Sequence, residues 1–415
     1  MPFLCFIVGA HRVAKPGNRR DLPRSLRAIE GAGKLARIAQ QPRPHAMRVL
    51  FITRAFPPVV GGIENHNHAL SVWLPHYATV KTLANRRGKR ALAWFLPFAT
   101  LFALFARPRY DVVLLGDGVL AITGWIIKRL QPRQKVVCVV HGLDLIWPAR
   151  WYQRLWVRRF LPALDGLIAV SAPTRHQALA HGLAAASITV IPNGIETETL
   201  VGSYARADLA RCLGRDIAHT QVLLTAGRLA RRKGAAWFIR EVLPQLAPNT
   251  LYVLAGAGPA LAEIQTAIRD TQLQDRVLLL GQVSDATRNL LLNTVDVFVQ
   301  PNIAVPGDME GFGIAVLEAA VCGRPVVAAA LEGLLDAIAP QENGLLVAPA
   351  VASLWISTLN ELLADPQARH RLGTRAAQYT HEHHHWRLIA ARYAAAIGPP
   401  VSAPRAQHTS TQAIR

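Results

Sequence analysis

The chain has 415 residues, 51% of them hydrophobic, which is too much for one ordinary core and predicts two domains of roughly 150 to 200 residues each. The formal net charge of +20 predicts a partner with negative charge: a nucleic acid, an anionic lipid surface or a phosphate-rich substrate. The four cysteines, Cys5, Cys138, Cys212 and Cys322, are far apart and form no CxxC pair, which argues against a zinc site or a disulfide framework and favours a reducing cytoplasm.

Residues 1–46 look separate from the first domain. They carry nine Lys and Arg residues against two acidic ones, a net charge of +7, and Met47 then begins a clean strand. The apolar stretch 1–10 is too short to span a membrane, and its charges follow it, so it fits no signal peptide. We expect residues 1–46 to be a disordered extension or an artefact of the start codon, with a membrane-binding tail as the alternative.

The first domain opens with a glycine pair after a strand. The pattern predicts a strand over residues 49–53 and a helix over residues 63–74, joined by a turn. Gly61 and Gly62 end this turn, where an open α/β sheet binds ligands. We expect His66, on the helix, to be a packing residue.

An apolar helix over residues 91–106 follows a basic cluster at residues 86–90. Sixteen residues interrupted by Pro97 are too few to span a bilayer of about 30 Å. A basic cluster beside an apolar helix is typical of binding at a membrane surface, but a helix packed against the sheet would have a similar sequence. Both interpretations stay open.

Polar residues also follow the strand predicted over residues 135–140, which ends in His141, Gly142, Leu143 and Asp144. This position places them at the ligand-binding edge of a parallel sheet. By its chemistry alone, His141 is a general base, a hydrogen-bond donor to a sugar hydroxyl or a structural histidine.

Residues 147–160 alternate aromatic residues with arginines. Arg150, Arg154 and Arg158 are spaced by four residues and predict one helical stripe, suited to phosphates on a lipid headgroup or an acceptor. Stacking against nucleic-acid bases, or a solvated face with tryptophans in the core, would explain the same pattern.

A second series of strands and helices begins at residues 222–226, after a polar boundary at residues 196–216. Arg228 follows the first strand of this series and Lys233 opens the next helix. A diphosphate leaving group gains negative charge as its bond to the sugar breaks, and two fixed cations with helix N–H groups stabilise it without a metal.

The stretch 310–318, EGFGIAVLE, combines two carboxylates with a glycine turn and the start of a helix. Gly311 and Gly313 let backbone N–H groups approach a ligand closely, and the N-terminus of the helix suits a phosphate. Helical spacing predicts that Glu318 lies on about the same face as Glu310, roughly two turns away.

Four motifs in this order, HGLD at 141–144, PNG at 192–194, GRLARRKG at 227–234 and EGFGIAVLE, resemble glycosyltransferase family 4. These are retaining nucleotide-sugar transferases of GT-B architecture, and the resemblance runs from about Met47 to about Ile397. It implies an α/β fold of two Rossmann-like domains facing across a cleft. The implied parts are an acceptor domain at 47–200, a nucleotide-sugar domain at 201–380, a helix at 381–397 that crosses back to the first domain, and a disordered tail at 398–415.

The resemblance also implies the roles of the site residues. Glu310 would hold the hydroxyls of the donor sugar, His141 would contact that sugar near the reaction centre, and Glu318 would hold the ribose. The implied donor site consists of Gly61, Gly62, Arg228, Lys233, Val283, Gly311, Phe312, Gly313 and Glu318. The nucleotide diphosphate sugar is a co-substrate, and we expect no cofactor and no metal. Neighbouring histidines at 381–385 would point in different directions on a helix, which disfavours a metal site there.

The expected acceptor is a saccharide or a lipid-linked saccharide, in the synthesis of a cell-envelope or surface polysaccharide such as lipopolysaccharide. We expect a cytoplasmic enzyme, peripheral on the inner face of the plasma membrane if it contacts anionic lipid. The alternatives are a sugar-nucleotide epimerase and a membrane- or nucleic-acid-binding protein of the same fold without transferase activity. Nucleic acid is disfavoured because the clearest cations converge on the cleft and form no continuous track.

Overall fold

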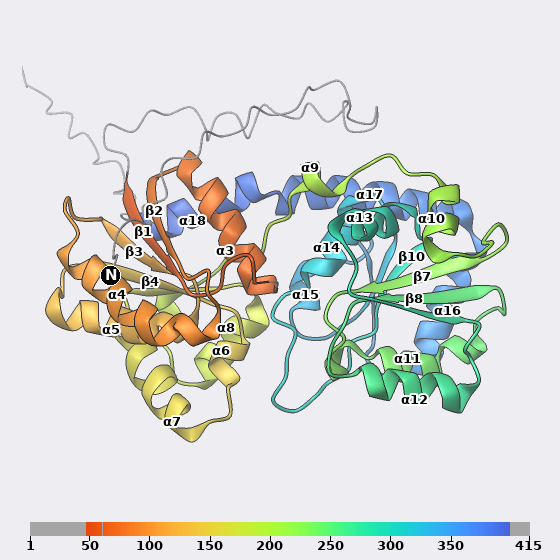
Figure 1. Cartoon of the computed structure of the whole chain (residues 1–415), viewed down its shortest axis with the longest axis horizontal. Coiled ribbons are helices and arrows are strands. Elements are labelled where there is room, and N and C mark those ends of the chain that lie inside the picture. The colour runs from red at the N-terminus through yellow and green to blue at the C-terminus, as the bar shows by residue number, and fades with distance from the viewer. Residues whose placement is uncertain (1–46, 60, 399–415) are drawn as a thin grey trace, which may run out of the picture. The chain divides into compact units, whose positions relative to one another are not determined.

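Two parallel six-stranded sheets organise the part of the chain that the computed structural model describes, residues 47–59 and 61–398 (Figure 1). The strand order is β2-β1-β3-β4-β5-β6 in the first sheet and β12-β11-β10-β7-β8-β9 in the second. Helices connect successive strands in both halves, so the predicted α/β class with two Rossmann-like halves is confirmed. The extension predicted at residues 1–46 and the tail at residues 399–415 lie outside the described residues.

The strands have the following bounds. The first sheet contains β1 (Arg48–Thr53), β2 (Thr79–Ala84), β3 (Val112–Leu115), β4 (Lys135–Val140), β5 (Gly166–Ala169) and β6 (Ile188–Val190). The second contains β7 (Gln221–Ala226), β8 (Thr250–Ala255), β9 (Val277–Gly281), β10 (Val297–Gln300), β11 (Val326–Ala329) and β12 (Leu345–Val347).

The helices are distributed over both halves. Those before β7 are α3 (Gly62–Trp73), α4 (Leu92–Phe105), α5 (Ala121–Leu130), α6 (Leu143–Ile146), α7 (Arg150–Tyr152), α8 (Ala172–Ala180), α9 (Thr197–Leu200) and α10 (Arg206–Leu213). Those after β7 are α11 (Ala235–Glu241), α12 (Leu261–Thr271), α13 (Asp285–Thr294), α14 (Ile314–Val321), α15 (Leu334–Ala337), α16 (Ala352–Ala364), α17 (Pro366–His384) and α18 (Trp386–Ile397).

Strand β1 shows why these sequences are continuously apolar. Alternate residues point to opposite faces of a strand, and both faces of a parallel sheet are covered. Val49 and Phe51 belong to the core on the α3 side, whereas Leu50 and Ile52 belong to the core that includes residues of α4 and α5. All four are fully buried.

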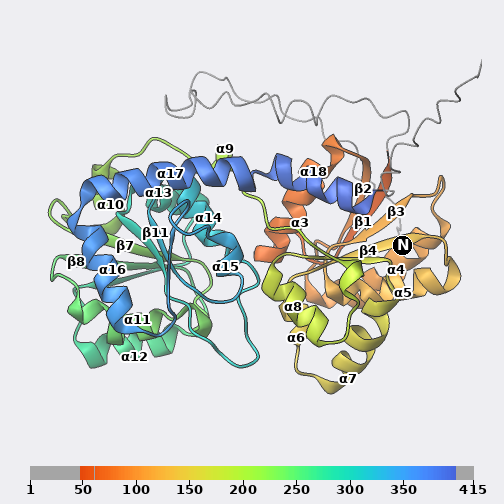
Figure 2. The same cartoon turned by 180° about the vertical axis from the view of Figure 1, so that it is seen from behind.

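The chain returns to the first half through its last helix. Figure 2 shows α17 followed by α18, which packs against α3. Tyr77 donates a hydrogen bond of 2.9 Å from its hydroxyl to the carbonyl of Arg387 in α18, and Lys135 Nζ donates one of 2.7 Å to the carbonyl of Gly398. We expected one crossing helix over residues 381–397, but His385 has an extended backbone that separates α17 from α18.

The predicted arginine stripe is not a feature of a regular α-helix. After α7, residues Gln153–Phe160 form a π-helix, in which each N–H bonds to the carbonyl five residues back. Arg150, Arg154 and Arg158 are all exposed, so the side chains of the expected stripe face solvent, although the backbone that carries them is not the regular α-helix that their spacing predicted.

Helix α4 carries an exposed apolar face. Trp94 is 83% exposed and Phe105 72%, while Ala99 and Thr100 are buried against the rest of the first half. Of the two interpretations of this segment, packing thus accounts for one side of the helix only. Among the described helices, none combines the length and the apolar character needed to cross a bilayer.

Candidate functional site

Glu310 forms a buried ion pair with Lys233. Its Oε2 lies 2.6 Å from Lys233 Nζ and 3.7 Å from Arg232 Nε, and it accepts a hydrogen bond of 3.3 Å from Asn302 Nδ2. Glu310 is 8% exposed and Lys233 7%. Burial by itself raises the pKa of Glu310, but Lys233 and Arg232 outweigh it and hold the pKa below its usual value. Glu310 is therefore ionised at neutral pH.

Gly234 explains how Lys233 comes so close to Glu310. It lies between a short 3₁₀ turn, Arg231–Lys233, and the first residue of α11, with φ +69°. A Cβ atom there would stand 1.7 Å from the carbonyl oxygen of Pro301, just beyond β10. Only glycine lets the two strand ends approach to this distance.

The backbone of Glu310 is fixed from the other side. Its N–H donates a hydrogen bond of 2.5 Å to Glu332 Oε2, and its carbonyl accepts one of 3.0 Å from Gly333 N. Gly313 follows with φ +91°, where an added Cβ would meet Leu334 at 2.5 Å. Glu310 is thus held by contacts of both its side chain and its backbone.

Glu310 and Glu318 do not lie on one helix, so the helical-face argument for them is wrong. Helix α14 begins only at Ile314, after the left-handed Gly313, and Glu310 belongs to the preceding loop. The Glu318 side chain is 16% exposed and lies 3.8 Å from Arg288. Burial raises its pKa, while the charges of Arg288 and Lys233 oppose the rise. The charge of Lys233 therefore acts on both carboxylates.

Arg228 and Arg232, two arginines of the loop after β7, have different surroundings. Arg228 is exposed, at the end of β7, and forms no ion pair within residues 47–59 and 61–398. Arg232 pairs with Glu310 and, at 3.2 Å, with Asp308. Sequence reasoning missed Arg232 and Asn302. Both lie in polar runs directly after strands, which is the signal that could have found them.

The other predicted donor residues vary in exposure. Phe312 is 2% exposed and its ring lies 6.0 Å from that of His384, so its side chain belongs to the core. Val283 is half-buried between β9 and α13.

The predicted glycines differ in the space around them. Gly62 starts α3 and has open space at its Cβ position. Gly61 precedes it with extended backbone, and no side chain caps the helix. Gly311 approaches a carbonyl closely, since a Cβ there would stand 2.4 Å from the oxygen of His141.

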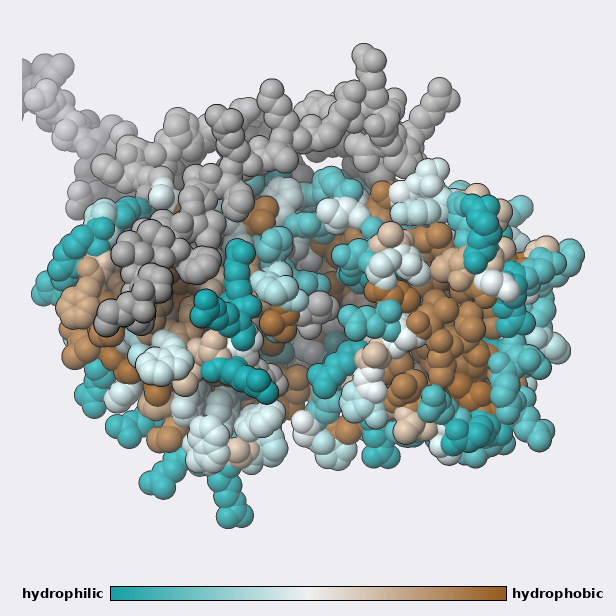
Figure 3. Space-filling view, viewed as in Figure 1, coloured by the Kyte–Doolittle hydropathy of each residue, from teal (hydrophilic) through white to brown (hydrophobic). Residues whose placement is uncertain are grey.

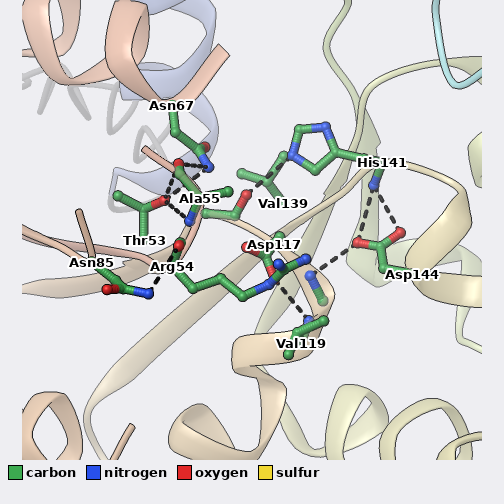
Figure 4. A network of polar contacts seen from close by, with 12 residues as sticks. Thr53, Arg54, Ala55, Asn67, Asn85, Asp117, Val119, Val139, His141 and Asp144 are labelled. Atoms are coloured by element: carbon green, nitrogen blue, oxygen red, sulfur yellow. Dashed lines mark hydrogen bonds and ion pairs between the residues drawn. The ribbon is translucent and has the colours of Figure 1, made fainter. Parts of the chain in front are cut away.

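His141 lies at the end of β4 in a network of buried polar groups (Figure 4). Its Nε2 is 3.0 Å from the carbonyl oxygen of Gly116, so Nε2 carries the proton and Nδ1 is left as the acceptor in the neutral ring. Its backbone N–H donates to Asp144 at 3.0 Å, and Gly118 N donates to the same carboxylate at 2.9 Å. Burial is the largest influence on Asp144 and raises its pKa.

A second ion pair borders this network. Arg54 Nε donates a hydrogen bond of 2.9 Å to Asp117 Oδ1, which also accepts one of 3.0 Å from Val119 N. Figure 4 shows the Arg54 side chain reaching toward Asp117 below the loop of His141. Asp117 is fully buried, and sequence reasoning missed both partners because they are 63 residues apart.

The histidines near position 383 contact different partners. His384 Nδ1 lies 3.4 Å from the carbonyl of Asn193, His385 Nε2 lies 3.1 Å from Glu198, and His381 Nδ1 lies 3.2 Å from Thr197. Among the described residues, no three His, Cys, Asp or Glu side chains are grouped so as to hold a metal ion.

Comparison with known families gives two matches. Residues 35–199 match the profile of Glycosyltransferase Family 4, and residues 217–379 match that of Glycosyl transferases group 1. The two matches lie on either side of residues 200–216, within the boundary that the sequence predicted.

Individual relatives match most of the length of this chain. The GDP-mannose-dependent alpha-(1-6)-phosphatidylinositol monomannoside mannosyltransferase of Mycolicibacterium smegmatis is 26% identical over 374 residues, covering 83% of this chain and 97% of that protein. A phosphatidylinositol N-acetylglucosaminyltransferase component of Arabidopsis thaliana is 27% identical, covering 74% of this chain and 72% of its own length. The solved structure of Anabaena HepE in complex with UDP has a TM-score of 0.68 and 22% identity, covering 84% of this chain and 98% of that one.

Proposed function

This chain belongs to glycosyltransferase family 4, with the GT-B fold, and we propose that it transfers a hexosyl group from a nucleotide diphosphate sugar to a lipid-linked saccharide acceptor with retention of anomeric configuration. Sugar transfer from a nucleotide sugar is the activity of the family. The acceptor and the stereochemistry are our proposal, and so are the roles of the residues.

The observation that carries the proposal is the ionised, buried Glu310 beside Lys233. A carboxylate accepts hydrogen bonds from sugar hydroxyls, and Glu310 keeps its charge because two cations lie within 3.7 Å of it. Lys233 has three N–H donors, of which the ion pair uses one, so it can also meet a phosphate. The pair of Glu310 and Lys233 would thus contact both the sugar and the diphosphate of one donor molecule.

We propose that fixed cations neutralise the leaving diphosphate, with no metal. Arg228 is exposed two residues after β7, and its guanidinium, which has five N–H donors, forms no ion pair among the described residues. Preorganised charges of this kind stabilise the transition state because they need no reorganisation when the bond breaks. In a retaining reaction the donor phosphate would then take the proton of the acceptor hydroxyl on the same face of the sugar.

His141 and Glu318 would complete the donor site. The carbonyl of Gly116 holds Nε2 of His141, and in the neutral tautomer that this contact selects, Nδ1 can accept a hydrogen bond from a sugar hydroxyl. Glu318 lies one turn into α14, where it would accept hydrogen bonds from the ribose. Gly62, whose Cβ position is open, would leave room for the phosphates, and Gly61 and Gly311 would contribute backbone groups to the site.

Replacing Arg228 by alanine should weaken binding of a nucleoside diphosphate at least tenfold, because one charge-assisted contact contributes about 1.5 to 3 kcal/mol. The matched control is Arg231→Ala, which removes the same charge from the same loop, where Arg231 faces Glu263 at 3.8 Å. Titration calorimetry with UDP, GDP and ADP measures both variants. Equal weakening in the two would mean that only the general basicity of the protein attracts the ligand, and the assignment of Arg228 would be withdrawn.

The first half offers a surface that fits an anionic membrane. Exposed apolar side chains on α4 include Trp94, Phe98, Leu101 and Phe105, each at least 55% exposed. Trp147 and Trp151, near α7, are 57% and 60% exposed. Figure 3 shows apolar residues on both halves of this face, with the larger apolar area on the second half. Helix α5 packs against both α4 and the π-helix, so these elements are neighbours.

Charge complementarity supports an anionic bilayer as the partner of this surface. The arginines Arg90, Arg150, Arg154 and Arg158 are exposed on the same elements or beside them, and lipid phosphates attract such clusters. A lipid-linked acceptor would present its saccharide at this surface. The M. smegmatis and A. thaliana relatives are both named for phosphatidylinositol-based acceptors, which supports a lipid of that chemical kind.

Replacing Trp94 and Phe105 together by serine should reduce binding to vesicles that contain anionic lipid by tenfold or more, since each exposed aromatic side chain that enters the interface contributes about 1.5 kcal/mol or more. Co-sedimentation at 0.3 M salt makes the measurement, because salt screens the general attraction of a +20 protein. The control, Leu335→Ser with Leu354→Ser, removes two exposed apolar side chains from the other half. Unchanged binding of the Trp94 and Phe105 variant would rule out α4 as the docking surface.

A further inference from the structure

The last helix of the chain places a tyrosine beside a histidine of the first half. Tyr393, in α18, is fully buried, and its hydroxyl oxygen lies 3.2 Å from Nε2 of His66 in α3. The two residues are 327 positions apart in the sequence. Trp386, at the start of α18, packs on the same imidazole with ring centres 5.2 Å apart. His66 is therefore held by α18 on one side.

On another side, His66 contacts His141. The two imidazoles are nearly perpendicular, at 83°, with ring centres 5.0 Å apart. His66 is 1% exposed. A displacement of its ring would therefore be passed directly to His141, which has no other aromatic neighbour within the described chain.

The protonation of this pair follows from burial. Burial raises the pKa of Tyr393, so its hydroxyl keeps its proton. Burial, and then the neighbouring His141, lower the pKa of His66 well below its usual value, so the ring is neutral. A neutral ring has one N–H and one acceptor nitrogen.

The hydrogen bond has one direction that gives the buried Tyr393 hydroxyl proton an acceptor. The contact with His66 is the one hydrogen bond of the Tyr393 hydroxyl within the described residues. If the hydroxyl donates to Nε2, its proton is satisfied, and the imidazole proton lies on Nδ1. In the reverse direction the buried hydroxyl proton would have no acceptor, whereas Nδ1 of His66 has no hydrogen-bond partner among the described residues in either direction. The Asn193 side chain lies close to His66 and favours a proton on this ring.

We propose that Tyr393 and His66 are positioning residues that fix the imidazole of His141, so that the last helix of the chain completes the donor-sugar site. The inference rests on the role of His141 under the proposed function. Gly116 anchors one nitrogen of His141, and His66 blocks rotation of the ring away from the orientation in which Nδ1 is free for the sugar. Turnover would therefore depend on the packing of α18 against α3.

The test is Tyr393→Phe, which removes one hydroxyl and keeps the ring. Turnover should fall up to about tenfold with an unchanged KM for the nucleotide sugar, because a hydrogen bond of about 0.5 to 1.5 kcal/mol is lost at a distance from the ligand. Tyr77→Phe is the matched control: it removes another hydroxyl that binds α18, at Arg387, and touches neither histidine. Its turnover should equal that of the wild type.

A double-mutant cycle distinguishes positioning from stability. If Tyr393 acts through His141, then Tyr393→Phe should have no further effect on turnover in a His141→Ala background. Equal turnover of the Tyr393→Phe and Tyr77→Phe variants, or the same loss with and without His141, would overturn the inference.

A readout that does not need activity separates this inference from the proposed function. In ¹⁵N spectra of histidine-labelled protein, assigned with His66→Asn and His141→Asn variants, wild-type His66 should carry its proton on Nδ1, and Tyr393→Phe should shift the His141 signals. Unshifted His141 signals would refute the coupling. If the signals shift while the wild type turns over no nucleotide sugar, the proposed function fails and the coupling of α18 to His141 stands.

Discussion

Replacing Glu310 by glutamine is expected to reduce turnover about 10²- to 10³-fold, the range seen when one preorganised polar contact to a reacting group is removed. The amide keeps the size of the side chain but loses the charge that would bind sugar hydroxyls. It also turns an N–H donor toward Lys233, whose Nζ lies 2.6 Å from the carboxylate. Release of nucleoside diphosphate from the donor sugar measures the turnover.

The control for this variant is Glu263→Gln. Glu263 is a partly exposed carboxylate of the same half that faces Arg231 and Arg240 and lies in α12, away from Lys233. It should leave turnover within about twofold of the wild type. If Glu310→Gln behaved like this control while the protein bound its donor normally, Glu310 would have no role in the chemistry.

Alanine is a less clean substitution at position 310. Removing one partner of a buried ion pair leaves the other charge uncompensated and costs about 3 to 5 kcal/mol. Lys233 and Arg232 would both lose their shared carboxylate, although Arg232 keeps Asp308. Loss of activity in Glu310→Ala would therefore mix a chemical effect with loss of stability; glutamine removes the same charge but leaves no cavity, so the stability of both variants is measured beside their turnover.

Replacing Gly234 by alanine is expected to lower the free energy of unfolding by about 3 kcal/mol or more. The backbone has φ +69°, and the new Cβ would stand 1.7 Å from the carbonyl oxygen of Pro301, so the strand ends must separate. That movement would also pull Lys233 from Glu310. Urea unfolding followed by circular dichroism measures the stability.

Gly214→Ala is the control that separates the strain of a left-handed backbone from the clash with Pro301. Gly214 has nearly the same conformation, φ +64°, at the end of α10, but its Cβ position has nothing within 4 Å. It should lose only about 1 kcal/mol, the cost of placing a side chain in the left-handed region. Similar losses in both variants would show that backbone strain alone matters and that close approach to Pro301 does not.

Much of the fold could be predicted from local sequence patterns. Strands such as 49–53 and 135–140 are short apolar runs that end in polar or glycine residues. A few consecutive residues are therefore enough to recognise them. The approach of Lys233 to Glu310 followed from the position of both at the ends of strands of one sheet. These signals are local, or depend on a simple rule of sheet topology.

The errors arose where geometry depends on something the spacing does not contain. Glu310 and Glu318 have helical spacing, but the left-handed backbone of Gly313 ends that regularity before the helix begins. The segment after Arg150 has helical spacing too, but its backbone shifts from α to π hydrogen bonding, so the expected type of helix was wrong there. Neither change alters the order of residue types.

Other contacts were beyond the sequence because they join distant segments. His66 was expected to pack, and it does, but its partners Tyr393 and His141 are 327 and 75 positions away. Arg232 and Arg228 are both cations in one basic loop, and only the folded loop decides which of them faces Glu310. Pair contacts of this kind are set by tertiary packing.

Thermal unfolding with a panel of UDP-, GDP- and ADP-sugars tests the central claim most directly, because a ligand that binds only the folded protein stabilises it by roughly 2.7 kcal/mol at 100 times its dissociation constant. We expect one nucleotide sugar to stabilise the wild type clearly, Arg228→Ala to lose that stabilisation, and Arg231→Ala to keep it. If no nucleotide sugar raised the midpoint while DNA or anionic vesicles did, the proposed donor site would be contradicted and a binding protein of the same fold would take its place.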